Sequence, residues 1–181
     1  YPAVREDHKW IVQILEDLAE RFELSPRLVQ RMVTRLMLVL RQTPENGYLD
    51  PIIVVFLIFL RIRNEELLRA FVAGRAQAGE VMAALRTVKP GGELFYNSHS
   101  GKLIEAYLLY AHNERHEYVA QLLGHVNELN GEANDVASLR MLEVQRRYQG
   151  VCSAHFERGS LDLERIEQRI NVIATDLREE R

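Results

Sequence analysis

The sequence predicts an all-α fold, a bundle of about seven or eight helices that can divide into two helical subdomains. Apolar residues recur at spacings of three and four along nearly the whole chain, which is typical of amphipathic helices. A helix-capping residue followed by proline occurs twice, at Ser25-Pro26 and at Asp50-Pro51. Clusters of Pro, Asn and Gly separate the periodic segments, as turns between helices require.

The N-terminal part of the chain, residues 1–88, is predicted to form a helical subdomain. Its expected helices are residues 5–22, 26–42, 51–63, 65–73 and a last one from Gly79 or Glu80 to about Val88. The run from Ile52 to Leu60 is the ambiguous element, because its β-branched residues favour a strand. The Asp-Pro start and the helical neighbours favour a helix. A helix that is apolar all round is expected to lie at the centre of the bundle.

The next residues, 89–101 (KPGGELFYNSHSG), are predicted to form a loop or linker because of their glycines and Pro90. Residues 102–181 are then expected to form a helical hairpin, 102–129 and 134–156, followed by a terminal amphipathic helix capped by Ser160. The terminal helix has a narrow apolar seam, formed by Leu163, Ile166, Ile170, Ile173 and Leu177. That seam could dock within its own bundle or pair with another chain.

Composition excludes several classes of function. The net charge of −3 gives no reason to expect a nucleic-acid partner. The single cysteine, Cys152, excludes an internal disulfide and a cysteine-based zinc cluster, which suits a reducing compartment. The longest apolar run is too short to span a membrane, and the first 20 residues do not resemble a secretory signal. We therefore expect a cytoplasmic protein without a membrane partner. Because the chain starts at Tyr1, it could be part of a longer one.

An arginine stripe is the first candidate site. Arg27, Arg31, Arg35 and Arg41 fall within roughly a third of the circumference of the second helix. Arg27 lies in the first helical turn, where the helix dipole disfavours a cation, so an external anion such as a phosphate is one explanation. The alternative is pairing with three carboxylates of the preceding helix, Glu16, Glu20 and Glu23.

The segment Ser98-His99-Ser100-Gly101-Lys102 echoes the end of a phosphate-binding loop. Such a loop needs Gly, four residues, then Gly-Lys-Ser/Thr. Here Tyr96 stands at the first position and Leu103 at the last, so the cradle and the magnesium-binding hydroxyl are missing. The segment is better explained as the start of a helix.

Two histidines could chelate a metal. His112 and His116 lie four apart on one helix face, and a third ligand would have to come from His125 or His155. The alternative is two solvated histidines on a polar face. Cys152 and His155, three apart, could pair a thiol with a base. Nothing in the sequence activates them, so a core cysteine is the simpler explanation.

Residues 24–73, roughly a quarter of the chain, resemble the helical region that follows the nucleotide-binding core in KAP-family P-loop NTPases. Leu24-Ser25 and the arginines from Arg27 to Arg35 match its opening and its Arg-rich helix. The apolar helix corresponds to Pro51–Arg63 and the closing Asn-Glu helix to Asn64–Phe71. Residues 102–181 match no known pattern, and the chain has neither a Walker A loop nor an acidic pair of Walker B type.

The resemblance implies a helical lid or regulatory domain of a longer NTPase, without catalysis of its own. ATP and Mg²⁺ would be held by the core of that parent, and Arg27 or Arg31 would sense the nucleotide phosphates. Members of this family take part in the exclusion of phage by bacteria. The expected partners are the NTPase core and other helical surfaces, or self-association through the last helix. Two alternatives remain: a protein–protein interaction module unrelated to nucleotide, and a small metal- or ligand-binding helical protein that uses His112 and His116.

Overall fold

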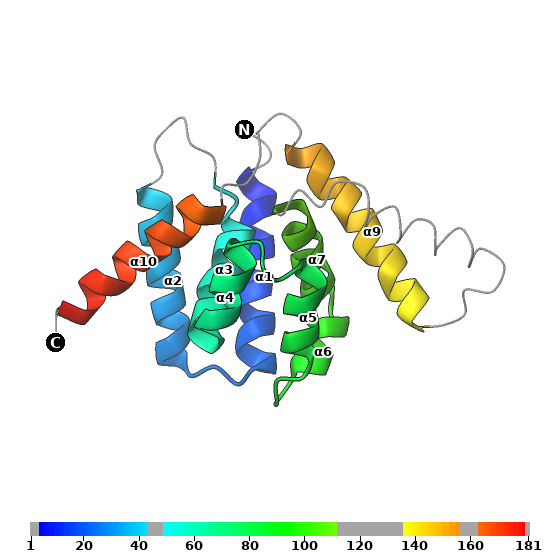
Figure 1. The fold of residues 1–181 in the computed structure, drawn as a ribbon, viewed down its shortest axis with the longest axis horizontal. Helices are drawn as coiled ribbons and strands as arrows, with labels where there is room; N and C mark the ends of the chain where they lie inside the picture. The colour runs from blue at the N-terminus through cyan, green and yellow to red at the C-terminus, as the bar shows by residue number, and fades with distance from the viewer. Residues whose placement is uncertain (1–3, 43–48, 112–135, 156–162, 180–181) are drawn as a thin grey trace.

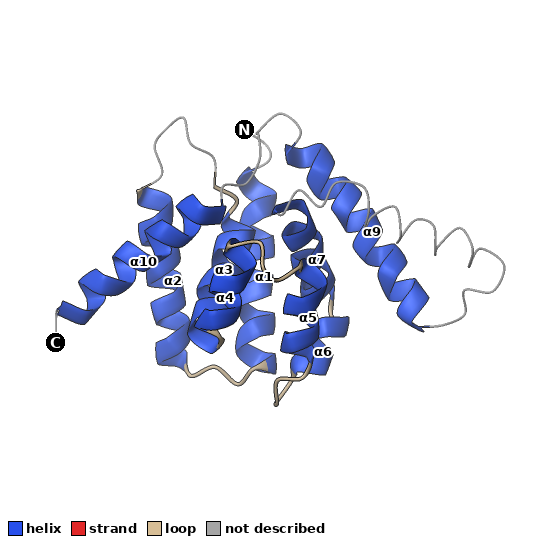
Figure 2. Cartoon of the chain, viewed as in Figure 1, coloured by secondary structure: helices blue, strands red, loops and turns tan. Residues whose placement is uncertain are grey.

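A computed structural model describes residues 4–42, 49–111, 136–155 and 163–179. All regular secondary structure in these ranges is helical, which confirms the all-α prediction, and no strand occurs among them (Figure 2). The helices are α1 (Val4–Arg21), α2 (Pro26–Arg41), α3 (Pro51–Arg63), α4 (Glu65–Val72), α5 (Ala78–Arg86), α6 (Gly92–Asn97), α7 (His99–Ala111), α9 (Val136–His155) and α10 (Leu163–Glu179).

Helix α3 occupies the centre of the molecule. It contacts α1, α2, α4, α7 and α10, and the first three surround it in Figure 1. Every residue from Ile52 to Leu60 is buried, so this run is the central helix that its composition predicts and not a strand. The reason is that apolar side chains on all sides of a helix can be buried only if other helices cover every side.

Capping residues set the helix starts. The side chain of Ser25 accepts a hydrogen bond from the Leu28 amide (3.3 Å), and that of Asp50 accepts one from the Ile52 amide (2.8 Å). Asn64 likewise caps α4 by accepting a hydrogen bond from the Leu67 amide. Each such cap stabilises a helix by about 1 kcal/mol.

The prediction of a loop over residues 89–101 is wrong for most of that segment. Residues 92–97 form the short helix α6, and α7 begins at His99 rather than at Lys102. The segment is also partly buried, with Phe95 inaccessible to solvent. Glycine density suggested a flexible linker, but the glycines instead allow close backbone approach within the bundle: a Cβ on Gly92 would lie 2.2 Å from the Leu85 carbonyl oxygen.

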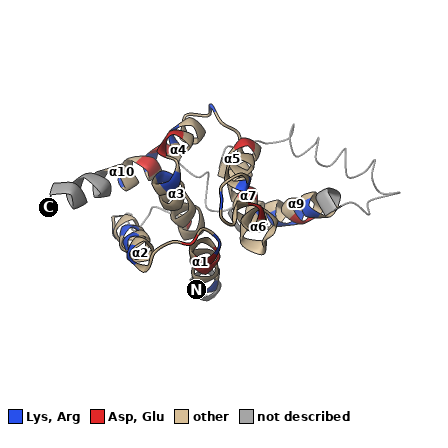
Figure 3. Cartoon of the chain, turned by 90° about the horizontal axis from the view of Figure 1, so that it is seen from below, with Lys and Arg blue, Asp and Glu red and all other residues tan. Residues whose placement is uncertain are grey.

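Helices α9 and α10 lie at opposite edges of the bundle in both views of the ribbon (Figures 1 and 3). Both contribute to one apolar cluster that also contains the N-terminal helices, through Val144 and Val151 of α9 and Ile166 and Ile170 of α10. The cluster includes buried residues on both sides of residues 89–101. Among the described helices, none is long and apolar enough to cross a membrane.

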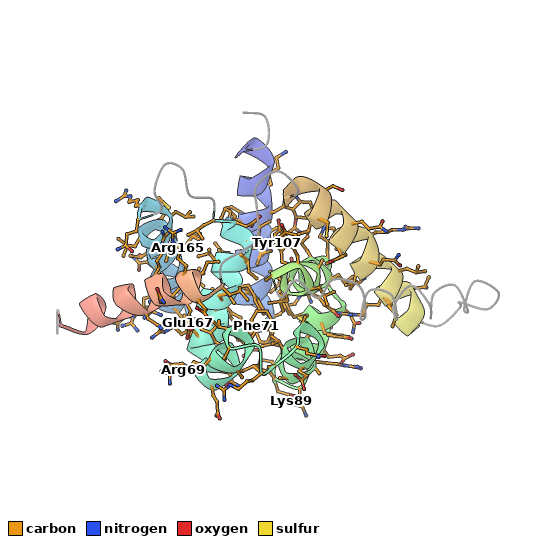
Figure 4. All side chains as sticks on the ribbon, turned by 45° about the horizontal axis from the view of Figure 1, so that its top comes forward. Arg69, Phe71, Lys89, Tyr107, Arg165 and Glu167 are labelled. Atoms are coloured by element: carbon orange, nitrogen blue, oxygen red, sulfur yellow. The ribbon has the colours of Figure 1, made fainter. Side chains whose placement is uncertain are left out.

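Side chains fill the spaces between the helix axes. In Figure 4, Phe71 of α4 points into the bundle while Arg69 of the same helix points outward. Phe71 is fully buried, whereas the Arg69 side chain is 63% exposed and pairs with Glu65 one turn earlier. The spacing of apolar and charged residues along α4 therefore predicts correctly which face of this helix is buried, as expected for a helical period of 3.6.

Candidate functional site

The start of α2 is held by the turn that precedes it. Glu23 adopts a left-handed backbone conformation (φ 49°) after the last turn of α1, and the Leu24 amide bonds back to the Ala19 carbonyl. Arg63, at the end of α3, donates a hydrogen bond to the Phe22 carbonyl (2.7 Å). The end of α1 is thus tied to the end of α3, and α2 begins from a defined position.

Arg27 and Arg31 are both exposed on the first two turns of α2. Neither forms an ion pair or hydrogen bond with another residue that the structure describes. The carboxylates offered as alternative partners, Glu16, Glu20 and Glu23, are themselves exposed and do not reach these two guanidinium groups. In Figure 3, arginine accounts for all the charge on α2, because residues 26–41 include no acidic side chain.

The other two arginines of the stripe differ from this pair. Arg35 is half-buried and already makes contacts within the chain, so it does not belong to the exposed edge. Arg41 is exposed in the last helical turn, where the dipole favours a cation. The candidate site is therefore the pair Arg27 and Arg31, which we call the N-terminal arginine pair.

The chemistry of the N-terminal arginine pair is anion binding. Two residues four apart lie on the same helix face about 6 Å apart along the axis. A planar guanidinium presents two parallel N–H donors that match a phosphate or carboxylate. A single phosphate could therefore contact both side chains, and nothing on this helix would repel it.

The segment of residues 98–102, which resembles the end of a phosphate-binding loop, forms the junction between α6 and α7 and has a structural role. Ser98 caps α7 by accepting from the Gly101 amide (3.0 Å), and buried Ser100 donates to Asp17 of α1. A Cβ on Gly101 would lie 2.0 Å from the Phe95 carbonyl oxygen, so only glycine fits there. Lys102 pairs with Glu143 of α9. Each polar group thus has a partner within the chain, and the segment starts a helix as predicted.

His99, in the same junction, stacks on Trp10 of α1, with ring centroids 4.9 Å apart and planes 7° from parallel. Its Nδ1 accepts a hydrogen bond from the Arg147 guanidinium (2.8 Å), which has donors only. Partial burial and then the Arg147 charge lower the pKa of His99, opposed by the carboxylates of Glu143 and Asp17. The lowered pKa favours the neutral ring above pH 6.5, and the Arg147 donor at Nδ1 places the proton of that neutral ring on Nε2.

A buried ion pair joins α7 to α9 and has no clear signal in the sequence. Arg140 donates to Glu105 (2.5 Å), and both side chains are nearly inaccessible. Arg140 also donates to the Tyr96 carbonyl (3.0 Å) and lies over the Tyr96 ring, 3.4 Å from its centroid. Burial raises the pKa of Glu105, and the Arg140 charge opposes that rise. In the sequence, the only sign of this pair is Glu105, an acidic residue within the apolar run of α7. Its partner Arg140 is 35 residues away, so local spacing does not identify it.

The histidine hypothesis falls outside the described part of the chain. His112, His116 and His125, and the side chain of His155, are not among the described residues. Within the described residues, no group of three or more His, Cys, Asp or Glu side chains is placed to hold a metal ion. Cys152 is a half-buried free thiol on α9.

The seam of the terminal helix docks within the chain over its described length. Leu163, Ile166 and Ile170 are buried, and α10 contacts α2, α3 and α4. The side chains of Ile173 and Leu177 lie outside the described residues. This docking fixes the rear of α2 while leaving the N-terminal arginine pair exposed.

Comparison of the chain with protein-family models, with curated proteins and with solved structures gives no match.

Proposed function

We propose that this chain is the helical lid or regulatory domain of a KAP-like P-loop NTPase, and that its N-terminal arginine pair contacts the nucleotide phosphates held by the core of that protein. The chain itself performs no hydrolysis in this proposal. ATP and Mg²⁺ are bound by the parent's core in the cytoplasm, and the exclusion of phage is the parent's role.

The observation that carries the proposal is the exposure of Arg27 and Arg31 without a partner among the described residues. Arg27 lies at the positive end of a helix dipole, an unfavourable position for a cation that an external anion would make favourable. The resemblance of residues 24–73 to the region after a nucleotide-binding core supplies the identity of that anion.

The arginine pair would act on the nucleotide by charge. Negative charge on the phosphate oxygens is stabilised by guanidinium groups that are already in place, because no reorganisation is then needed. The buried rear of α2, formed by Met32, Leu36 and Val39, keeps the pair on a rigid support. Loss of the transferred phosphate would weaken the contact and let the helical domain move relative to the core.

The test uses the longer protein encoded by the same reading frame. ATP hydrolysis is measured for the wild type and for Arg27→Ala and Arg31→Ala, and thermal unfolding is followed in parallel. We expect kcat/KM to fall by at least about tenfold in each variant, with little change in Tm, because both side chains are exposed. Arg27→Lys keeps the charge but loses the two-pronged contact, so it should recover only part of the rate.

The matched control is Arg41→Ala, an exposed arginine of the same helix about 21 Å from Arg27 along the axis. It should leave hydrolysis unchanged. The proposal fails if the longer reading frame has no nucleotide-binding core. It also fails if Arg41→Ala slows hydrolysis as much as the other two, or if Arg27→Ala acts by unfolding the protein.

A further inference from the structure

The C-terminal half of α2 presents a second feature that the nucleotide proposal does not use. Val33 and Met37 are 38% and 47% exposed, and they lie four residues apart on one ridge of the helix. Arg41 continues the same ridge one turn later and is also exposed. We call these three residues the α2 ridge.

From the α2 ridge we infer a docking site for an acidic amphipathic helix of a partner protein, with an apolar pair that covers Val33 and Met37 and a carboxylate that reaches Arg41. The inference goes beyond the nucleotide proposal and does not depend on it. Arg27 and Arg41 are about 21 Å apart along the axis, so a phosphate at Arg27 leaves the ridge uncovered.

Apolar exposure is unusual at this place. Five large apolar side chains are exposed among the described residues, and Val33 and Met37 are the only two of these that share one helix. Single exposed apolar residues are ordinary on a protein surface, whereas neighbouring ones indicate a contact surface. Methionine is also well suited to such surfaces, because its flexible thioether adapts to different partners.

Charge decides the nature of the occupant. The sixteen residues of α2 include four arginines and no acid. Arg41 lies next to Met37 at the end of the ridge, and it has no partner among the described residues. An interface with an apolar centre and an arginine at its edge is completed by a partner with apolar residues and flanking carboxylates.

Other occupants fit less well. A second copy placed with its own α2 ridge against this one would bring like charges together. A membrane surface needs a broad apolar face, but the apolar side of α2 is already buried against α3 and α10. That same burial makes the ridge rigid before binding, which lowers the entropic cost of docking.

The test uses a fluorescent synthetic helix of about 15 residues, long enough for four turns, with leucines four apart and flanking glutamates. Its binding to the full chain is measured by anisotropy, and the site is mapped by amide chemical shifts. We expect the largest shifts in residues 30–41. Met37→Glu and Arg41→Glu should each weaken binding by at least about tenfold, since they change the apolar centre and the charged rim.

Val12→Glu is the matched control, because Val12 is 52% exposed on α1, away from the ridge. It should leave binding unchanged, and a peptide with lysines in place of the glutamates should not bind. The inference is overturned if the acidic peptide does not bind, if the lysine peptide binds equally well, or if Val12→Glu weakens binding as much as Met37→Glu. It is also overturned if the chain forms a dimer that Met37→Glu dissociates, or if anionic phosphatidylserine vesicles bind the ridge and the acidic peptide does not. Unchanged Tm in the three variants excludes unfolding as the cause.

Discussion

Helices α3 and α9 are held in the bundle by different physics. Nine consecutive residues of α3, Ile52–Leu60, are buried, and none of them is charged. In α9, the buried apolar residues of the described part are Val144 and Val151. Helix α9 also makes polar contacts with α7 and the residues before it, through Arg140, Glu143 and Arg147.

The comparison shows that the position of one helix follows from its apolar composition, whereas the position of the other depends on specific partner residues. Burial of apolar area is non-directional, so α3 needs only neighbours of roughly the right shape. A buried ion pair is directional and stabilises only when both members are present. We therefore expect changes in α3 to affect the whole protein and changes around α9 to affect mainly the α7–α9 contact.

The largest effect is expected in the core. Phe56→Ala should lower the free energy of unfolding by about 3–5 kcal/mol, because a buried ring leaves a cavity that its neighbours fill only in part. Chemical denaturation measures this loss. Leu94→Ala is the control, since Leu94 is 63% exposed and its loss should change stability by less than about 0.5 kcal/mol. Equal effects in the two variants would contradict the central position of α3.

The ion pair between α7 and α9 should give the next largest effect. Glu105→Ala leaves Arg140 buried without its carboxylate and should cost about 3 kcal/mol. Replacing both together, Glu105→Leu with Arg140→Met, should cost much less, because no unpaired charge remains. Hydrogen exchange should show the Glu105→Ala loss mainly in α9. Uniform loss of protection across α1 and α3 would mean that α9 is part of the cooperative core.

A third variant tests the junction between α6 and α7. Gly101→Ala places a methyl group against the Phe95 carbonyl oxygen and should destabilise the protein by about 1–3 kcal/mol. Gly150→Ala on α9 is the matched control, because its new Cβ would contact nothing within 4 Å. Alanine there should stabilise the helix by about 0.5–1 kcal/mol. Thermal unfolding distinguishes the two, and stabilisation by Gly101→Ala would show that α6 and α7 can move apart.

The smallest effect concerns pH. Because the pKa of His99 in the folded protein is below its ordinary value of 6.5, the folded state binds fewer protons than the unfolded state in this region. The stabilising contribution is therefore present above pH 6.5 and is lost as the pH falls through the lowered pKa. A series of Tm measurements should show this loss, and it should be reduced in His99→Gln. The effect is small because His99 is only partly buried.

Much of the fold could be predicted from local sequence patterns. Ser25 and Asp50 were predicted as caps, and each accepts the expected backbone hydrogen bond. These predictions succeed because capping and helical periodicity involve residues only a few positions apart. The prediction for residues 89–101 failed for the opposite reason. Glycines that fit close backbone contacts cannot be told from glycines of a loop unless the contacting helix is known.

For the candidate site, the sequence by itself determined the charge and the tertiary structure decided the accessibility. The stripe from Arg27 to Arg41 is visible in the spacing of arginines along one helix. Only the packing of α2 in the bundle decided that Arg35 is half-buried while Arg27 and Arg31 are exposed. The pairing of Glu105 with Arg140 was decided in the same way. Which charges remain free depends on groups brought together from distant parts of the chain, and spacing along one helix does not specify them.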